Sequence, residues 1–168
     1  MDRRRLLKWL FGLPALTMTG AGLAQSMDGV GPPLRKSKAA WAALLPREAY
    51  LVLFEEATER AGTSALNRER RDGTYVCAAC GLALFDSSRK YDSGTGWPSF
   101  WQPLPAGLGS KTDFKLLYPR TEYHCARCGG HQGHLFDDGP QPTGKRYCNN
   151  GVALHFVPRA DRLPELRT

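Results

Sequence analysis

The spacing of hydrophobic residues divides this chain into three parts. An apolar stretch runs from about Leu6 to Leu23, and a segment with helical spacing follows at residues 38–60. From Gly73 onward the apolar runs are short, and turn residues separate them. Spacings of three and four residues are typical of helices, whereas short runs between turns are typical of strands. The pattern therefore predicts a mainly β fold with short N-terminal helices.

Residues 38–60 carry apolar side chains at helical spacing, and Pro46 divides the segment. Proline suits the first turn of a helix, so we expect two short helices with Pro46 at the start of the second. Four residues share one face of the second helix and are expected to be buried: Tyr50, Leu53, Phe54 and Ala57.

The part of the chain after Gly73 contains short apolar or alternating runs that predict strands. They read TYVC, LALF, FWQP, DFKLLY, EYHC, GHLF, RYC and ALHFVP. Turn signals such as LPAGLG and DDGPQPTG lie between them. This alternation is typical of antiparallel sheets with functional loops.

The N-terminus has the layout of a secretory signal. Three arginines, Arg3 to Arg5, precede the apolar stretch, which Lys8, Gly12 and Pro14 interrupt, and the small residues of AGLA offer a cleavage site after Ala24. The opening DRRRLLK resembles a twin-arginine signal. An uncleaved membrane anchor is the alternative, but the apolar stretch is interrupted and rather short for a span of about 20 residues.

These features predict the organisation and the location of the protein. We expect residues 1–24 to be an export signal, residues 25–37 a polar linker rich in Gly and Pro, and residues 38–168 the folded domain. The protein is then expected to be exported, with the periplasm as its location. Membrane anchoring by an uncleaved signal remains the alternative.

The charge of the chain gives little indication of nucleic-acid binding. The formal net charge is +7, and the basic residues before Ala24 account for part of it. The remaining excess is typical of a solvated surface rich in Lys and Arg. We therefore expect no nucleic-acid partner, and export also argues against one.

Four of the five cysteines form two C-x-x-C-G units, Cys77 with Cys80 and Cys125 with Cys128. Each such turn can direct two thiolates to one metal ion, and two turns complete the tetrahedral four-cysteine site of structural zinc. Short-range disulfides and a thioredoxin-like redox pair are the alternatives. We favour one structural zinc ion, which would connect two distant segments and leave no open position for chemistry.

Cys148 is the cysteine outside these two units. Arg146 lies two residues before it and would share its face of a strand, where a guanidinium lowers the pKa of a thiol. Asn150 would lie on that face too if the strand continued, where it could hydrogen-bond a substrate. An inert buried cysteine is the alternative. These polar surroundings favour a reactive thiolate.

Histidines and aromatic residues supply further candidate chemistry. His131 and His134 lie among glycines in GGHQGHLFDDGP, and a histidine near a reactive thiol can exchange a proton near neutral pH. Trp97 and Phe100 lie in the Gly- and Pro-containing segment SGTGWPSF. Large aromatics in a loop are often walls of a binding pocket, although anchoring the loop is the alternative for Phe100.

The motifs CAACG, SGTGWPSF, HCARCGGHQGHLFDDGPQPTG and RYCNN, in this order, resemble the peptide-methionine (R)-S-oxide reductase family. The resemblance covers about residues 38–158. It implies a small, mostly antiparallel fold with two sheets, and reduction of methionine R-sulfoxide in peptides or proteins. A scaffold that has lost this activity, a zinc-binding interaction module and a C-x-x-C oxidoreductase are the rival interpretations.

The resemblance also implies a role for each candidate residue. Cys148 would be the nucleophile, and Trp97 would contact the methyl group of the sulfoxide. His131 and His134 would bind and protonate its oxygen, with His134 the better acid. Three further positions match polar residues of the active site of the family: Asp138, Arg146 and Asn150. The two C-x-x-C units would hold the zinc.

One departure from the family pattern concerns the regeneration of the enzyme. Many members read SGCGWPSF, in which the cysteine resolves the oxidised nucleophile, whereas this chain has Thr95 at that place. We therefore expect an enzyme with one catalytic cysteine, whose sulfenic acid an external thiol such as a thioredoxin-like partner reduces. A monomer is expected. Milder departures are Gln132, Gly151 and Ala153.

Overall fold

The computed structural model describes residues 30–168. The predicted export signal therefore lies outside the described residues. Within residues 30–168 no helix has both the length and the apolar character needed to cross a membrane.

Two short helices precede the sheets, as predicted from the spacing of residues 38–60. Helix α1 spans Lys38–Leu44 and begins where the Ser37 hydroxyl accepts a hydrogen bond from the Ala40 amide. Helix α2 spans Arg47–Glu55. Pro46 is the N-cap of α2 and so precedes the first helical turn, in which it was predicted to lie. The helix ends at Glu55, before the end of the predicted segment at residue 60.

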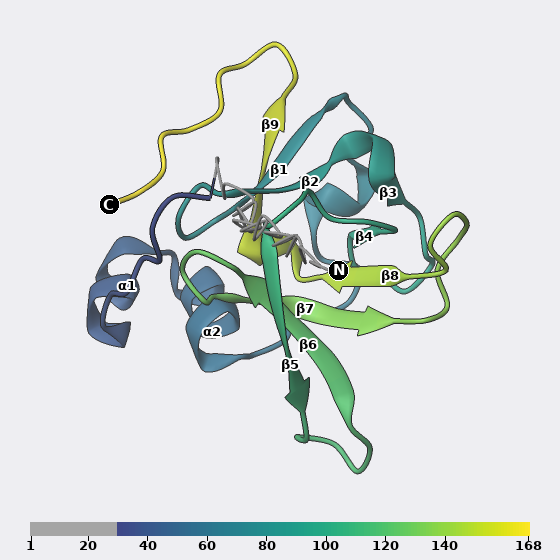
Figure 1. The fold of residues 1–168 in the computed structure, drawn as a ribbon, viewed down its shortest axis with the longest axis horizontal. Coiled ribbons are helices and arrows are strands. Elements are labelled where there is room, and N and C mark those ends of the chain that lie inside the picture. The colour runs from purple at the N-terminus through teal and green to yellow at the C-terminus, as the bar shows by residue number, and fades with distance from the viewer. Residues whose placement is uncertain (1–29) are drawn as a thin grey trace, which may run out of the picture.

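The predicted apolar face of α2 packs on the core. Leu53 is buried, while Tyr50 and Phe54 are partly buried against the same cluster. The Phe54 ring stacks on Trp41 of α1 with a centroid distance of 4.9 Å. Leu53 also lies against Gly130. A β-carbon added at Gly130 would lie 2.9 Å from the Cδ2 atom of Leu53. The helices thereby reach the turn that precedes β7 (Figure 1).

The strands form two antiparallel sheets, which confirms the predicted fold class. The smaller sheet has the order β2-β1-β9 and the larger one the order β3-β4-β8-β7-β6-β5. The bounds are β1 Gly73–Cys77, β2 Ala83–Asp86, β3 Lys90–Tyr91, β4 Ser99–Phe100, β5 Leu108–Asp113, β6 Arg120–Cys125, β7 His131–Phe136, β8 Arg146–Asn149 and β9 Leu154–Pro158.

Two predicted strands differ from the structure. Of the run FWQP, only Phe100 lies in a strand, at the end of β4. The run DFKLLY was expected to be a strand, but β5 is the more polar segment Leu108–Asp113, and the mainly apolar residues 114–118 form the turn that follows it. Pairing with β6 decides this, because the register runs from Leu108 opposite Cys125 to Asp113 opposite Arg120. Apolar content alone therefore selected the wrong half of this hairpin.

Aromatic rings from both sheets fill the core. Phe85 of β2 stacks on Phe100 of β4 at 4.1 Å, and Tyr75 of β1 meets the same Phe100 ring edge-on at 4.9 Å. Phe100 has no exposed surface. Its ring joins the two sheets, and its predicted role in substrate binding stays a prediction.

The described part of the predicted linker lies on the domain. The Leu34 amide donates a hydrogen bond of 2.7 Å to the Arg127 carbonyl, and the Leu34 side chain packs against the core. The segment between residues 30 and 37 thereby contacts the turn after β6.

We predict that Phe100→Ala destabilises the fold by about 3–5 kcal/mol, because removal of a fully buried ring leaves a cavity. Phe114→Ala is the matched control, since that side chain is 75% exposed and its loss should cost less than about 0.5 kcal/mol. Urea unfolding of both variants measures the difference. Equal losses would contradict the assignment of Phe100 to the core.

Candidate active site

Cys148 lies in the middle of a row of residues that crosses the large sheet. On β8 it is directly opposite Ser99 of β4 on one side and His134 of β7 on the other. Residues directly opposite one another in antiparallel strands project to the same face. The sheet therefore places the thiol and the imidazole of His134 side by side.

A glycine allows β7 and β8 to approach closely at this point. A β-carbon at Gly133 would lie 1.9 Å from the Cys148 carbonyl oxygen, which no side chain can tolerate. The glycine between the two histidines of HQGH is thus required by the strand that carries the thiol.

Burial and charge act in opposite directions on the Cys148 thiol. Burial raises its pKa above the ordinary value, whereas the Arg146 guanidinium and the Thr95 hydroxyl lower it. The lowering effect of Arg146 agrees with the sequence analysis, but burial is the larger effect and the net shift is upward. The thiolate therefore forms less readily than the sequence predicted.

The Arg146 guanidinium is held between a carboxylate and an aromatic ring. Its Nε and Nη2 atoms donate hydrogen bonds of 2.7 and 2.8 Å to the two oxygens of Asp138. Its Cζ atom also lies over the Phe136 ring, 4.2 Å from the ring centroid. Asp138 thus orients Arg146, and Arg146 keeps the pKa of that carboxyl below its usual range.

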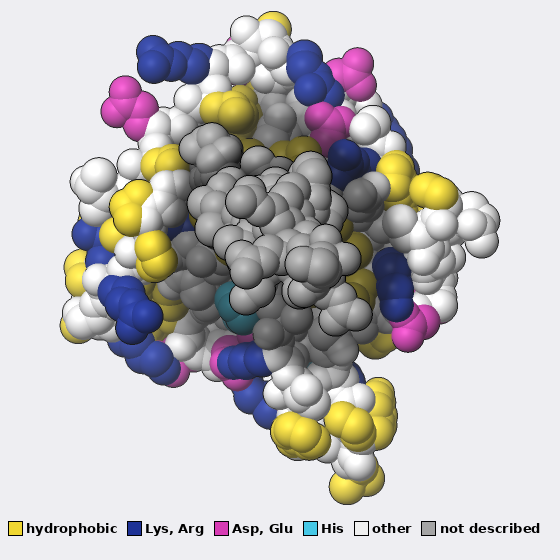
Figure 2. Space-filling model, in the orientation of Figure 1, with side chains coloured by type: hydrophobic (Ala, Val, Ile, Leu, Met, Phe, Trp, Pro, Cys, Tyr) yellow, Lys and Arg dark blue, Asp and Glu magenta, His cyan; other side chains and the backbone are white. Residues whose placement is uncertain are grey.

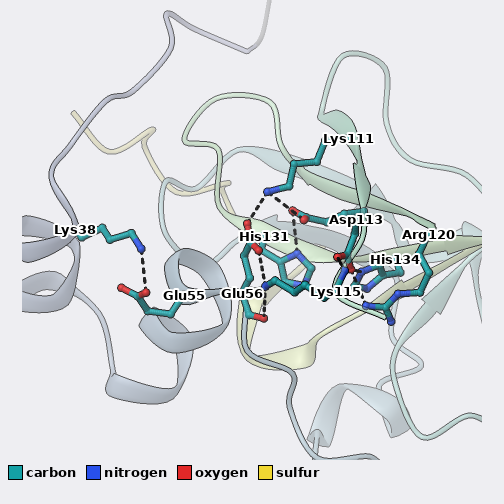
Figure 3. A network of polar contacts seen from close by, with 10 residues as sticks. Lys38, Glu55, Glu56, Lys111, Asp113, Lys115, Arg120, His131 and His134 are labelled. Atoms are coloured by element: carbon teal, nitrogen blue, oxygen red, sulfur yellow. Dashed lines mark hydrogen bonds and ion pairs between the residues drawn. The ribbon is translucent and has the colours of Figure 1, made fainter. Parts of the chain in front are cut away.

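The His134 imidazole is oriented by an acidic residue from the neighbouring hairpin. Its Nε2 atom lies 2.7 Å from Oδ2 of Asp113, which in turn accepts a hydrogen bond of 2.6 Å from Arg120 (Figure 3). The Lys115 amide also donates to Asp113 and is the largest cause of its lowered pKa. Asp113 is therefore an ionised partner that holds His134 in place.

His131 lies behind His134 and has only 3% of its surface exposed. Its Nδ1 atom is 3.1 Å from Oε1 of Glu122, and its ring meets the His134 ring edge-on at 5.4 Å. Burial lowers the pKa of His131, so its ring is mostly neutral at pH 7. His131 packs against His134 and is not among the residues that line the cavity described next, and its contact with substrate stays a prediction.

A cavity of about 110 Å³ opens beside Cys148. Its walls include three residues that the sequence analysis had selected besides the thiol: Trp97, His134 and Asn150. Phe136 also lines the cavity and adds an apolar surface. Phe100, Arg146, Asp138 and His131 are not among the residues that line it.

Asn150 orients the wall of this cavity by hydrogen bonds. Strand β8 ends at Asn149, so Asn150 does not continue the face of Cys148 as predicted. Its Oδ1 accepts from the Glu59 amide at 2.9 Å, and its Nδ2 donates to the Gln132 carbonyl at 3.0 Å. The Glu59 carbonyl in turn accepts a hydrogen bond of 2.9 Å from the Trp97 indole. Asn150 thereby positions Trp97 through Glu59.

Two departures from the family pattern have structural roles. In the Gln132 side chain, the Nε2 atom lies 3.5 Å from the Cys77 sulfur, and the Oε1 atom accepts a hydrogen bond of 3.3 Å from the Asn149 side chain. A β-carbon at Gly151 would come within 1.9 Å of the Ser64 hydroxyl, so glycine leaves room for that side chain.

The four paired cysteines come together between the two sheets. Cys77 ends β1 and Cys125 ends β6, and each begins a turn that returns to the second cysteine of its pair. The Gly81 and Gly129 amides donate to the Cys77 and Cys125 carbonyls, both at 2.9 Å. Both glycines have φ above +70°, which explains the glycine after each C-x-x-C.

The sulfur atoms have the spacing of metal ligands. All four lie within 4.8 Å of one another, and the closest pairs join different turns: Cys80 with Cys125 at 3.5 Å and Cys77 with Cys128 at 3.7 Å. Tetrahedral zinc with Zn–S bonds of about 2.3 Å separates its sulfurs by about 3.8 Å. The four thiols are free and could hold a metal ion.

Comparison with known proteins agrees with this arrangement. Residues 45–158 match the SelR domain. The chain belongs to the SelR family of peptide methionine sulfoxide reductases. It is 50% identical over 124 residues to a peptide methionine sulfoxide reductase MsrB of Leptospira interrogans, covering 73% of this chain and 95% of the relative. A homologue of Thiobacillus denitrificans is 50% identical over 125 residues, covering 74% and 95%.

A plant relative of the SelR family shows the same similarity over a smaller share of its length. The chloroplastic peptide methionine sulfoxide reductase B1 of Arabidopsis thaliana is 48% identical over 115 residues, which are 68% of this chain and 57% of the relative.

Sequence reasoning missed the contributions of residues distant along the chain. Thr58, Arg120 and Phe136 line the cavity, and Asp113 and Glu59 act through their partners. Phe136 lies two residues after His134 on β7 and so shares its face. That alternation was the one signal that would have found it.

We predict that Arg146→Met raises the pKa of the Cys148 thiol further, because it removes the cation that opposes burial. Thiolate then forms at higher pH, and alkylation by iodoacetamide at pH 8 should slow by about tenfold for each unit of added shift. Mass spectrometry of the Cys148 peptide measures the rate from pH 7 to 10. Arg159→Met, on an exposed ion pair with Asp86, is the control. An unchanged pH profile would show that Arg146 does not act on the sulfur.

Proposed function

We propose that this protein reduces methionine R-sulfoxide in peptides or proteins to methionine, with Cys148 as the nucleophile. The observation that carries the proposal is the cavity beside Cys148, in which Trp97 and Phe136 supply apolar walls and His134 lies across from the thiol. A methyl sulfoxide has an apolar methyl group and one strong acceptor oxygen, which match these walls.

The reaction begins with attack of the Cys148 thiolate on the sulfur of the sulfoxide. His134, oriented by Asp113, donates a proton to the sulfoxide oxygen, which makes the sulfur more electrophilic. The oxygen is transferred to Cys148 as the sulfoxide is reduced by two electrons to the thioether. Methionine leaves, and Cys148 remains as sulfenic acid.

An external thiol completes the cycle. Cys148 is the one cysteine outside the metal cluster, and Thr95 stands near its sulfur where many relatives carry a resolving cysteine. A thioredoxin-like reductant would attack the sulfenic sulfur, release water and form a mixed disulfide, which its second thiol resolves. This route leaves the metal ligands intact.

The four-cysteine cluster is proposed to hold one zinc ion. Its spacing fits a tetrahedral four-sulfur site, and a closed site has no position for substrate. The ion would act as a crosslink between the turn after β1 and the turn after β6. The signal-like sequence before the described residues leads us to propose that the protein is exported to the periplasm. We also propose that the protein is a monomer.

We predict that zinc-loaded protein consumes the R epimer of a methionine-sulfoxide peptide with dithiothreitol as reductant and leaves the S epimer intact. Cys148→Ser should abolish turnover, because the hydroxyl is a far weaker nucleophile at neutral pH. Chromatography of the two separate epimers measures the loss of each. Inactivity of the folded, unaltered protein on both epimers would overturn the proposed function.

We predict about one zinc ion per chain by elemental analysis, and a strong loss of stability when Cys80→Ser removes a ligand. The melting temperature should fall by 10 °C or more, since structural zinc contributes directly to folding free energy. Cys148→Ser is the matched control, with zinc content and melting temperature unchanged. Retention of both by Cys80→Ser would argue against a structural metal.

A further inference from the structure

The turn between β5 and β6 exposes four large apolar side chains. We call them the apolar tip: Phe114, Leu116, Leu117 and Tyr118, which are 75%, 47%, 108% and 60% exposed. Figure 2 shows apolar side chains gathered at the projecting end of this hairpin. Single exposed apolar residues need no explanation, but four within five positions mark an interaction surface.

The hairpin that carries the apolar tip also builds the active site. Asp113, the last residue of β5, holds His134, and Arg120, the first residue of β6, lines the cavity beside Cys148. Leu117 is four residues from Asp113, so at most about 14 Å of extended chain separates them. A polypeptide with one residue in the cavity can therefore reach the apolar tip within about four residues.

The charges around the apolar tip favour a polypeptide over a lipid surface. Lys115 pairs with Glu56, and Lys111 pairs with both Glu56 and Glu122 (Figure 3). Arg120 pairs with Asp113, so three cations face three carboxylates. Each of these cations thus has a carboxylate partner, which leaves little excess charge to attract anionic lipid. An apolar segment of polypeptide needs no such charge.

We propose that the apolar tip is a docking surface for the substrate polypeptide, and that it binds an apolar side chain near the oxidised methionine in the sequence of that polypeptide. This inference rests on the proposed function. The oxidised methionine enters the cavity, and an apolar side chain about four residues away packs against Leu116 and Leu117.

The test uses the zinc-loaded protein, the double variant Leu116→Ser/Leu117→Ser, and Leu44→Ser/Leu163→Ser as the matched control. Leu44 and Leu163 are 46% and 45% exposed at other sites. Three substrates are compared: N-acetyl-methionine sulfoxide amide, a peptide with Leu-Phe four residues from the sulfoxide on either side, and the same peptide with Ser-Gly there. Circular dichroism checks that each variant is folded.

We expect the unaltered enzyme to prefer the Leu-Phe peptide over the Ser-Gly peptide by about tenfold in kcat/KM, mainly through KM. The tip variant should lose this preference and keep full activity on the short amide, while the control variant keeps both. A preference retained by the tip variant would overturn the docking surface alone. The docking surface for a polypeptide would also be overturned if the unaltered enzyme bound phosphatidylglycerol vesicles and the tip variant did not. Failure of the unaltered enzyme on the short amide would instead overturn the proposed function.

Discussion

Four cysteine sulfurs lie within 4.8 Å of one another where the ends of β1 and β6 meet, and these strands belong to different sheets. A metal ion held there would close a loop of more than forty residues and lock the sheets together. The same cluster touches the active site through Gln132, which bridges Cys77 and Asn149. The position of the catalytic strand β8 therefore depends on the cluster.

The second constraint is the contact between the segment after α2 and the end of β8. Glu59 accepts from the Trp97 indole and from the Gly151 amide, and its own amide donates to Asn150. These bonds join residues that lie 38 to 92 positions apart. The helices therefore contribute to the active site, because the segment that follows α2 carries Glu59, which positions Trp97 in one wall of the cavity.

The active site combines a partly buried thiol with a polar network on one side of it. Burial raises the pKa of Cys148, and Arg146 reduces that effect without reversing it. The same burial provides the apolar surface that a methyl group requires. The polar network consists of His134 and its partners Asp113 and Arg120. These two partners come from the β5–β6 hairpin, whose tip projects into solvent. Chemistry and substrate contact are therefore linked through β5 and β6.

The sequence by itself determined the features that depend on short spacing. The two C-x-x-C-G turns, the two helices, and Arg146 on the face of Cys148 all follow from local geometry, so they were predictable. Only the tertiary structure decided that Phe100 lies in the core, that the buried His131 packs on the His134 ring, and that residues 114–118 of the run DFKLLY form a turn. Strand pairing and burial connect distant residues, and periodicity within a short segment carries no information about such partners.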